Sequence, residues 1–175
     1  MTPDGLRLLL IGVLSAVLLS MLAVPLAMPH GTVDGLEGGH PVEPDFFDVW
    51  GTLDPIPATV YAVGDILCHQ DSDRSFHLNG SQLPICVRDI SALAGMIAGL
   101  VLCIPCGNSL KRFAYPLLLV SFSLMIADLI IQGSFGLNVF ATRILTGAFC
   151  GISVSVTIDR WLRSQWGTLR IIWMI

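Results

Sequence analysis

The segment from Cys68 to Asp89 holds most of the side chains in this chain that can take part in chemistry. It carries two cysteines, two histidines, two arginines and several aspartates between strongly apolar flanks. Thiolates and imidazoles are good ligands for zinc or copper, so the sequence predicts a candidate metal site here. Its candidate ligands are Cys68, His69, His77 and Cys86, with Asp89 as a further one.

The pair Cys68 and Cys86 has two other interpretations. A structural disulfide is the favoured one, because disulfides persist outside the cytoplasm and this bond would stabilise the fold by about 3 kcal/mol. The other is a reactive thiol pair in a membrane thiol–disulfide oxidoreductase. Since the chain has five cysteines, they cannot all be paired with one another.

The remaining cysteines favour structural roles. Cys103 and Cys106 form a C-x-x-C motif, which tunes thiols for exchange in other proteins. A mostly helical path puts Cys103 about 25 Å from Cys86, so direct exchange between the two pairs is not expected. We expect Cys103 and Cys106 to be small residues at a helix end, and Cys150 to be a packing residue on a helix face. No catalytic motif of the common hydrolase, metalloprotease or phosphate-loop types is present, so catalytic residues stay unassigned.

The composition indicates a membrane protein. Hydrophobic residues make up 54% of the chain and charged residues 13%, which is too apolar for a typical soluble domain. The net charge of −4 gives no electrostatic support for binding nucleic acid. The fold class predicted is an all-α membrane protein: a four-transmembrane-helix bundle with a short interfacial helix and an ordered extracytoplasmic loop.

The apolar run Leu6–Ala27 would reach about 33 Å as a helix, enough to span a bilayer. A cleaved signal peptide is the alternative, and a retained helix is favoured. The predicted segments are a first transmembrane helix in 1–28, an acidic Gly/Pro-rich external loop in 29–56, a core in 57–158 and an interfacial tail in 159–175. Within the core we predict an interfacial helix at 57–70, the polar loop at 71–89 and transmembrane helices at 90–105, 115–132 and 139–158. In the external loop, Phe46, Phe47 and Trp50 are expected to rest at the membrane surface.

The basic residues predict the orientation. With a cytoplasmic N-terminus, six of the nine lie inside: Arg7, Lys111, Arg112, Arg160, Arg163 and Arg170. Arg74, Arg88 and Arg143 lie towards the outer side. The positive-inside rule then places both termini of this multi-pass protein in the cytoplasm and the polar loop outside the cell membrane.

Charged side chains inside the predicted spans form a second candidate site. Such charges are costly in a bilayer and normally pair within the bundle. We predict that Asp128 pairs with Arg143 or Arg88, and that Gln132 and Asn138 complete a buried polar cluster. Its role is either to fix the register of the helices or to line a transport path. Ser91, Gly95 and Gly99 form a ridge of small residues that lets two membrane helices approach closely.

A resemblance rests on the residues of both candidate sites. They are Cys68-His69-Gln70, Arg74-Ser75-Phe76, Gly80, Gln82, Pro84, Cys86, Arg88, Asp128, Gln132, Asn138, Arg143 and Thr146-Gly147. This pattern, over roughly 60–151, resembles an uncharacterised prokaryotic membrane family named domain of unknown function 2085. Members of that family often have Cys-x-Arg-Cys, where this chain has Asp89 in place of the last cysteine. The resemblance implies a small multi-pass membrane protein and no particular activity.

The function predicted is that of an integral membrane protein that binds a metal or small ligand at its outward-facing Cys/His/Arg loop, or serves as an accessory subunit of a membrane complex. Enzymatic activity is not favoured. The alternatives are a thiol–disulfide oxidoreductase using Cys68 and Cys86, and a small transporter using Asp128 and Arg143. The partners expected are the lipid bilayer and other membrane subunits.

Overall fold

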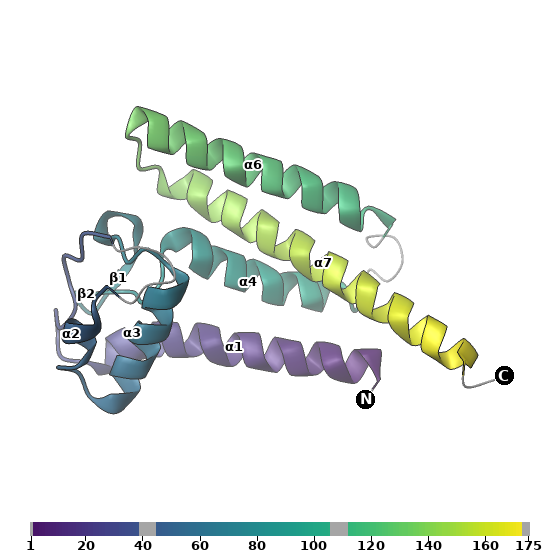
Figure 1. Ribbon diagram of the computed structural model, residues 1–175, viewed down its shortest axis with the longest axis horizontal. Helices are drawn as coiled ribbons and strands as arrows, with labels where there is room; N and C mark the ends of the chain where they lie inside the picture. The colour runs from purple at the N-terminus through teal and green to yellow at the C-terminus, as the bar shows by residue number, and fades with distance from the viewer. Residues whose placement is uncertain (1, 39–44, 106–111, 173–175) are drawn as a thin grey trace. The chain divides into compact units, whose positions relative to one another are not determined.

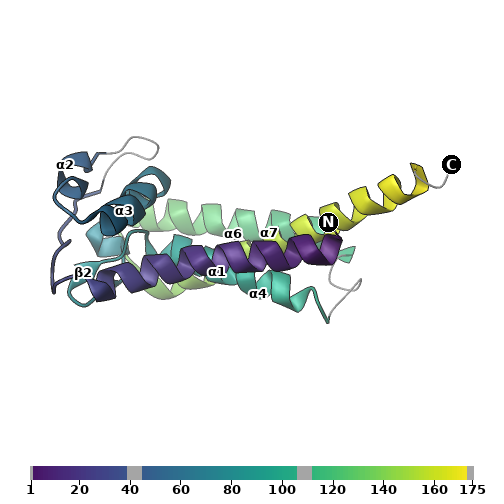
Figure 2. The same ribbon diagram turned by 90° about the horizontal axis from the view of Figure 1, so that it is seen from below.

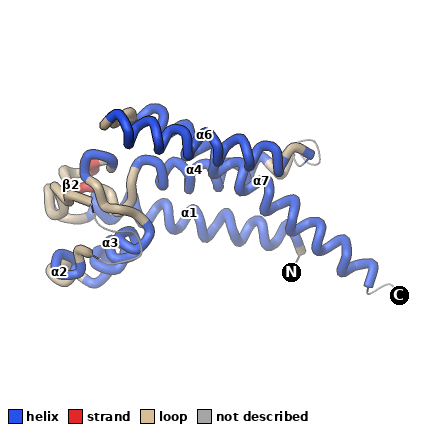
Figure 3. Tube along the Cα trace, turned by 45° about the horizontal axis from the view of Figure 1, so that its top comes forward, coloured by secondary structure: helices blue, strands red, loops and turns tan. Residues whose placement is uncertain are grey.

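The computed structural model describes residues 2–38, 45–105 and 112–172, and most of them are helical (Figures 1 and 3). The helices are α1 (Pro3–Ala27), α2 (Phe47–Trp50), α3 (Pro55–Leu67), α4 (Val87–Leu102), α6 (Ala114–Phe135) and α7 (Phe140–Ile172). A 3-10 helix (Ser72–Arg74) and an antiparallel hairpin, β1 (His77–Leu78) with β2 (Ser81–Gln82), lie between α3 and α4. The chain divides into two compact units, residues 1–15 with 91–175, and residues 16–90. The predicted helical class is confirmed.

Three helices in the described ranges are long and apolar enough to cross a membrane: α1, α6 and the part of α7 up to Trp166. The predicted second span, at 90–105, corresponds to α4, which has 16 residues and ends at Leu102. It ends early because a proline, here Pro105, disfavours the helical conformation of the residue before it. Its length of about 24 Å is less than the roughly 30 Å hydrocarbon core of a bilayer.

Two further helix boundaries differ from the prediction. Helix α6 continues past Gln132 to Phe135, and Gly136 ends it in the left-handed conformation at φ +61°, with its amide bonded to the Gln132 carbonyl. Helix α7 does not end at Ile158, because no glycine or proline lies between Ile158 and Gly167. The predicted tail at 159–175 therefore begins inside a helix, whose C-terminal part runs on past α6 in Figure 2.

Helices α4 and α7 pack through glycine in the first unit. A Cβ atom on Gly95 would collide with the Ala148 carbonyl oxygen, and one on Gly151 would collide with the Ala92 carbonyl oxygen. A Cβ atom on Gly99 would also be too close to α7. The small-residue ridge predicted from the sequence is thus the contact between these two helices. Helix α6 lies alongside α7 in the same unit (Figure 1).

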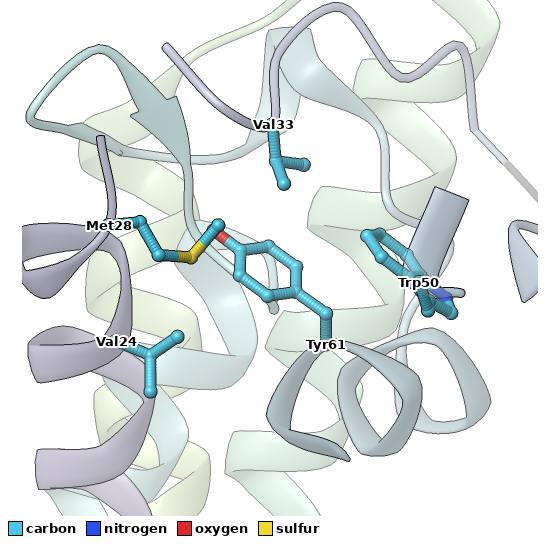
Figure 4. Close-up of a cluster of buried hydrophobic side chains, with 5 residues drawn as sticks. All are labelled: Val24, Met28, Val33, Trp50 and Tyr61. Atoms are coloured by element: carbon cyan, nitrogen blue, oxygen red, sulfur yellow. The ribbon is translucent and has the colours of Figure 1, made fainter. Parts of the chain in front are cut away.

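The second unit has its own apolar core of Val24, Met28, Val33, Trp50 and Tyr61 (Figure 4). The rings of Trp50 and Tyr61 are stacked with centroids 5.1 Å apart. Trp50 is only 2% exposed, so the prediction that it rests at a membrane surface is wrong. Burial against another aromatic ring stabilises it more than a position in a loop would.

Candidate functional site

The end of α3 positions the first cysteine of the site. The helix stops at Leu67, and Cys68 has an extended backbone (φ −143°, ψ 153°) with its amide bonded to the Gly64 carbonyl at 2.8 Å. A side chain on Gly64 would collide with the Pro84 carbonyl, so only glycine lets this turn lie against the segment before α4. Buried Gln70 donates its side-chain amide to the same Pro84 carbonyl.

Helix α3 also holds the β-hairpin in place. The buried Tyr61 hydroxyl donates to the Gln82 carbonyl at 2.6 Å, and the Gln82 amide donates to the Val33 carbonyl at 2.7 Å. One turn along α3, the Asp65 carboxylate accepts from the Trp50 indole at 2.9 Å. Burial raises the pKa of Tyr61, so its hydroxyl remains protonated and can keep donating. These contacts set the path of the chain that leads to Cys86.

That path brings three potential metal ligands together. One ligand atom from each of Cys68, Cys86 and Asp89 lies within 4.8 Å of the others. The Cys86 amide donates to the Cys68 sulfur at 3.2 Å, and the Cys86 thiol donates to the Asp89 carboxylate at 3.1 Å. Cys68 is 5% exposed. Cys86, which lies just before α4, and Asp89, which lies in its first turn, are both partly exposed.

The predicted disulfide between Cys68 and Cys86 is not formed. Both residues are free cysteines, and the Cys86 thiol is engaged by Asp89. The sequence placed the two cysteines close together correctly, but a disulfide also requires sulfur atoms about 2 Å apart. The carboxylate, which a spacing argument between cysteines does not consider, competes for one thiol.

The two thiols differ electrostatically. The hydrogen bond between the two thiol side chains lowers the pKa of Cys86 and outweighs the opposing effect of burial. The same hydrogen bond raises the pKa of Cys68, and burial and the neighbouring Asp89 charge add to that shift. Cys86 is therefore the first of the pair to become a thiolate, the form that binds metals and attacks electrophiles.

Neither predicted histidine belongs to the group of close ligand atoms in the described part of the chain. His77 begins β1, where its Nε2 lies 3.1 Å from the Ser72 hydroxyl and 3.2 Å from the Asp34 carboxylate. His69 is exposed just after Cys68. The structure thus assembles Cys68, Cys86 and Asp89 without the two imidazoles.

The second candidate site is centred on Gln132 in the first unit. Gln132 accepts from Arg143 Nε at 2.6 Å, and its amide donates to the Asp128 carboxylate at 2.7 Å and to the Thr142 hydroxyl at 2.8 Å. Gln132 and Arg143 are each about 95% buried. Gln132 thus contacts both Asp128 and Arg143, and Thr142 is a member that the sequence did not reveal.

The other two predicted members are Asn138 and Arg88. Asn138 is exposed in the turn between α6 and α7. Arg88 belongs to the second unit, within residues 16–90. Of the other cysteines, Cys103 and Cys150 are buried, in keeping with packing roles, and Cys106 lies outside the described residues.

A group of four charges was not anticipated. Arg7 binds Asp159 at 2.6 Å, and their side chains are only 5% and 2% exposed. Arg163 contacts Asp159 at 3.4 Å and Asp4 at 2.6 Å, and Asp4 lies 3.6 Å from Arg7, which closes a ring. The signal in the sequence was a charge next to each apolar run, since such charges normally find partners.

Comparison with known proteins finds one similarity. A family model described as "Predicted membrane protein (DUF2085)" matches residues 68–157, from Cys68 through most of the first unit's helices. No curated protein and no solved structure is significantly similar to this chain. The matched region contains the three close ligands and the Gln132 cluster.

Proposed function

We propose, from the premise that this chain belongs to the predicted membrane protein family named domain of unknown function 2085, that it binds a transition metal ion. The ligands in this proposal are Cys68, Cys86 and Asp89. The observation that carries it is the presence of two thiols and a carboxylate whose ligand atoms all lie within 4.8 Å of one another. Two thiols and a carboxylate at this separation form a donor set of the kind that binds metal ions.

The donor set favours zinc. Zinc accepts both thiolate and carboxylate ligands, at about 2.3 Å and 2.0–2.2 Å, in a tetrahedral arrangement. Two sulfur ligands in that geometry are about 3.8 Å apart, which fits within the observed 4.8 Å. Copper(I) prefers sulfur alone, and magnesium and calcium prefer oxygen alone, so the mixed set suits them less.

The proposed setting is the outer face of a multi-pass membrane protein. Helices α1, α6 and α7 are apolar and long enough to span. In this proposal α4 also crosses the membrane, as the second of four spans, because its glycine contacts with α7 allow close packing within a bundle. The six-to-three division of basic residues then puts the site outside and the termini in the cytoplasm.

Metal titration of the purified protein tests the proposal. We expect the reduced protein in lipid nanodiscs to bind one Co²⁺, with sulfur-to-metal charge-transfer absorption, and Zn²⁺ to displace it. Cys68→Ser and Cys86→Ser should each remove the absorption, and Asp89→Asn should weaken binding. Cys150→Ala, which changes a buried cysteine of the first unit, should bind normally. No charge-transfer band at any Co²⁺ concentration would refute metal binding here.

A second candidate is a membrane thiol–disulfide oxidoreductase. It is favoured by one observation, namely that two free thiols share a partly exposed site. Under this alternative, the protein should oxidise a dithiol substrate to its disulfide while a quinone accepts the two electrons and two protons, and both cysteine variants should be inactive. Metal binding without any such turnover would favour the first proposal.

A further inference from the structure

We infer that the Cys68–Cys86–Asp89 site is an exchange site, which takes up a divalent zinc-class ion from solution and releases it to an acceptor. The inference rests on the proposed function, because it describes how the same site would handle its metal. The alternative is a structural metal that holds the fold together. Three observations distinguish the two.

First, the site is positioned by contacts that need no metal. The chain between Cys68 and Cys86 is already fastened to α3 by the Gln70–Pro84 and Tyr61–Gln82 hydrogen bonds. The backbone amide of Leu83 also donates to the Phe76 carbonyl at 2.8 Å, and the backbone amide of Gln82 donates to the Val33 carbonyl. A structural zinc site contributes folding energy outright, whereas a preformed site does not depend on its ion.

Second, the described residues supply three close ligands rather than four. Structural zinc sites use four protein ligands, whereas sites that keep a position open have three. Cys86 and Asp89 are also partly exposed, so an acceptor's donor atom has access to the open position. A bound ion can then move by ligand exchange, in which an incoming donor bonds to the ion before Asp89 leaves.

Third, the chain around the site is strongly acidic. Ten of the 13 acidic residues, but only two of the nine basic ones, lie between His30 and Ile90. Arg74 and Arg88 are those two. A local excess of negative charge raises the concentration of cations nearby and speeds their association. The sequence therefore favours capture of a cation in the unit that carries the site.

The test is transfer of Zn²⁺ from the loaded full-length protein in nanodiscs to a chromophoric chelator. We expect release to be complete within minutes, and the Co²⁺ association rate to fall as salt is added. Asp89→Cys should slow zinc release roughly tenfold or more, because a third thiolate replaces a weaker oxygen ligand. Asp89→Asn should speed release, and this variant keeps the test valid if Asp89→Cys does not fold.

Circular dichroism and thermal unfolding before and after chelation supply the second readout. We expect the helical signal to be retained in the metal-free protein and the melting temperature to fall only by the amount that ligand binding adds. A protein that binds zinc but loses its fold on chelation, or holds zinc for hours, overturns the exchange inference and leaves metal binding standing. A protein that binds no Co²⁺ or Zn²⁺ overturns both.

Discussion

Cys86 and Cys68 occupy one cluster but differ in two properties that control thiol reactivity. Cys68 is almost completely buried, and its pKa is raised mainly by the hydrogen bond with Cys86. Cys86 is partly exposed, and the same hydrogen bond lowers its pKa. Because the thiolate is the reactive form, exposure and a lowered pKa both favour reaction at Cys86. Burial and a raised pKa both disfavour reaction at Cys68.

We expect iodoacetamide to alkylate Cys86 several-fold faster than Cys68 at neutral pH in the reduced, metal-free protein. Peptide mass spectrometry over a time course measures both rates. In the Cys68→Ala variant the hydrogen bond that stabilises the Cys86 thiolate is lost, so the pH at which Cys86 becomes reactive should rise. Equal rates for the two cysteines would contradict the asymmetry.

Gln132 is the residue on which the buried polar cluster depends. It accepts from Arg143 and donates to Asp128, so Gln132→Leu should destabilise the protein by roughly 1.5–3 kcal/mol, as expected for lost bonds to charged groups. Unfolding in mixed detergent micelles measures this change. Thr142→Val, which removes the bond from Gln132 and a local bond to the Val139 carbonyl, should cost less because both are bonds between neutral groups.

A double variant separates a structural role from a functional one. Adding Arg143→Leu to Gln132→Leu should recover part of the lost stability, because the buried charge is removed together with its acceptor. If the losses of stability from Gln132→Leu and Arg143→Leu simply add in the double variant, Gln132 does not stabilise Arg143. A bound solute would then be the better explanation for the pair.

At the scale of elements, the packing of α4 on α7 depends on positions where any side chain would enter the opposite backbone. Gly95 and Gly151 are such positions, and each faces a carbonyl group of the other helix. Gly133, by contrast, has no atom within 4 Å of where its Cβ would lie. The three glycines are all helical, so they differ in packing rather than in backbone conformation.

We expect Gly95→Ala and Gly151→Ala each to destabilise the protein by about 1–3 kcal/mol, the usual cost of overpacking. Gly133→Ala should be neutral or stabilising by up to about 1 kcal/mol, because alanine favours the helix. Thermal unfolding in nanodiscs compares the three variants. Equal effects at all three positions would show that α4 and α7 do not pack as described.

At the scale of the molecule, the ring of Asp4, Arg7, Asp159 and Arg163 joins two ends of the chain within the first unit. Its inner pair, Arg7 and Asp159, is buried, whereas Asp4 is exposed. A buried ion pair with one member removed leaves an uncompensated charge. This contact also joins the N-terminal part of α1 to α7 within the first unit.

Arg7→Ala should therefore destabilise the protein by about 3–5 kcal/mol, and Asp159→Asn in the same chain should recover much of the loss. Asp4→Asn should change stability by less than about 1 kcal/mol, because its contacts are at the surface. Unfolding in mixed micelles gives the values. A mild effect of Arg7→Ala would mean that the ring does not hold α1 to α7.

The predicted orientation leads to a labelling result in intact cells. A membrane-impermeant maleimide should modify Cys86 and leave Cys106 unmodified, because the charge distribution puts these two cysteines on opposite sides. Single-cysteine variants, labelled before and after permeabilisation, provide the comparison. Labelling of Cys106 in sealed cells would reverse the topology and remove the proposed outer-face setting of the site.

The properties that the sequence by itself determined are those carried by local composition and spacing. Long apolar runs identified a helical membrane protein, and small residues four apart identified the face of α4 that meets α7. The sequence also singled out the Cys68–Asp89 segment, in which the structure brings Cys68, Cys86 and Asp89 close together. Each of these depends on residues within a few turns of one another, where helix geometry is fixed in advance.

The tertiary structure alone decided which distant side chains meet. It joined Asp89, rather than His69 or His77, to the two cysteines, and it left the cysteines unbonded. It also placed Gln132 between two charges and buried Arg7 against Asp159. These contacts depend on how turns such as those at Gly64 and Gln70 direct the chain, and on competition among many polar groups for partners. Spacing along the sequence carries no information about either.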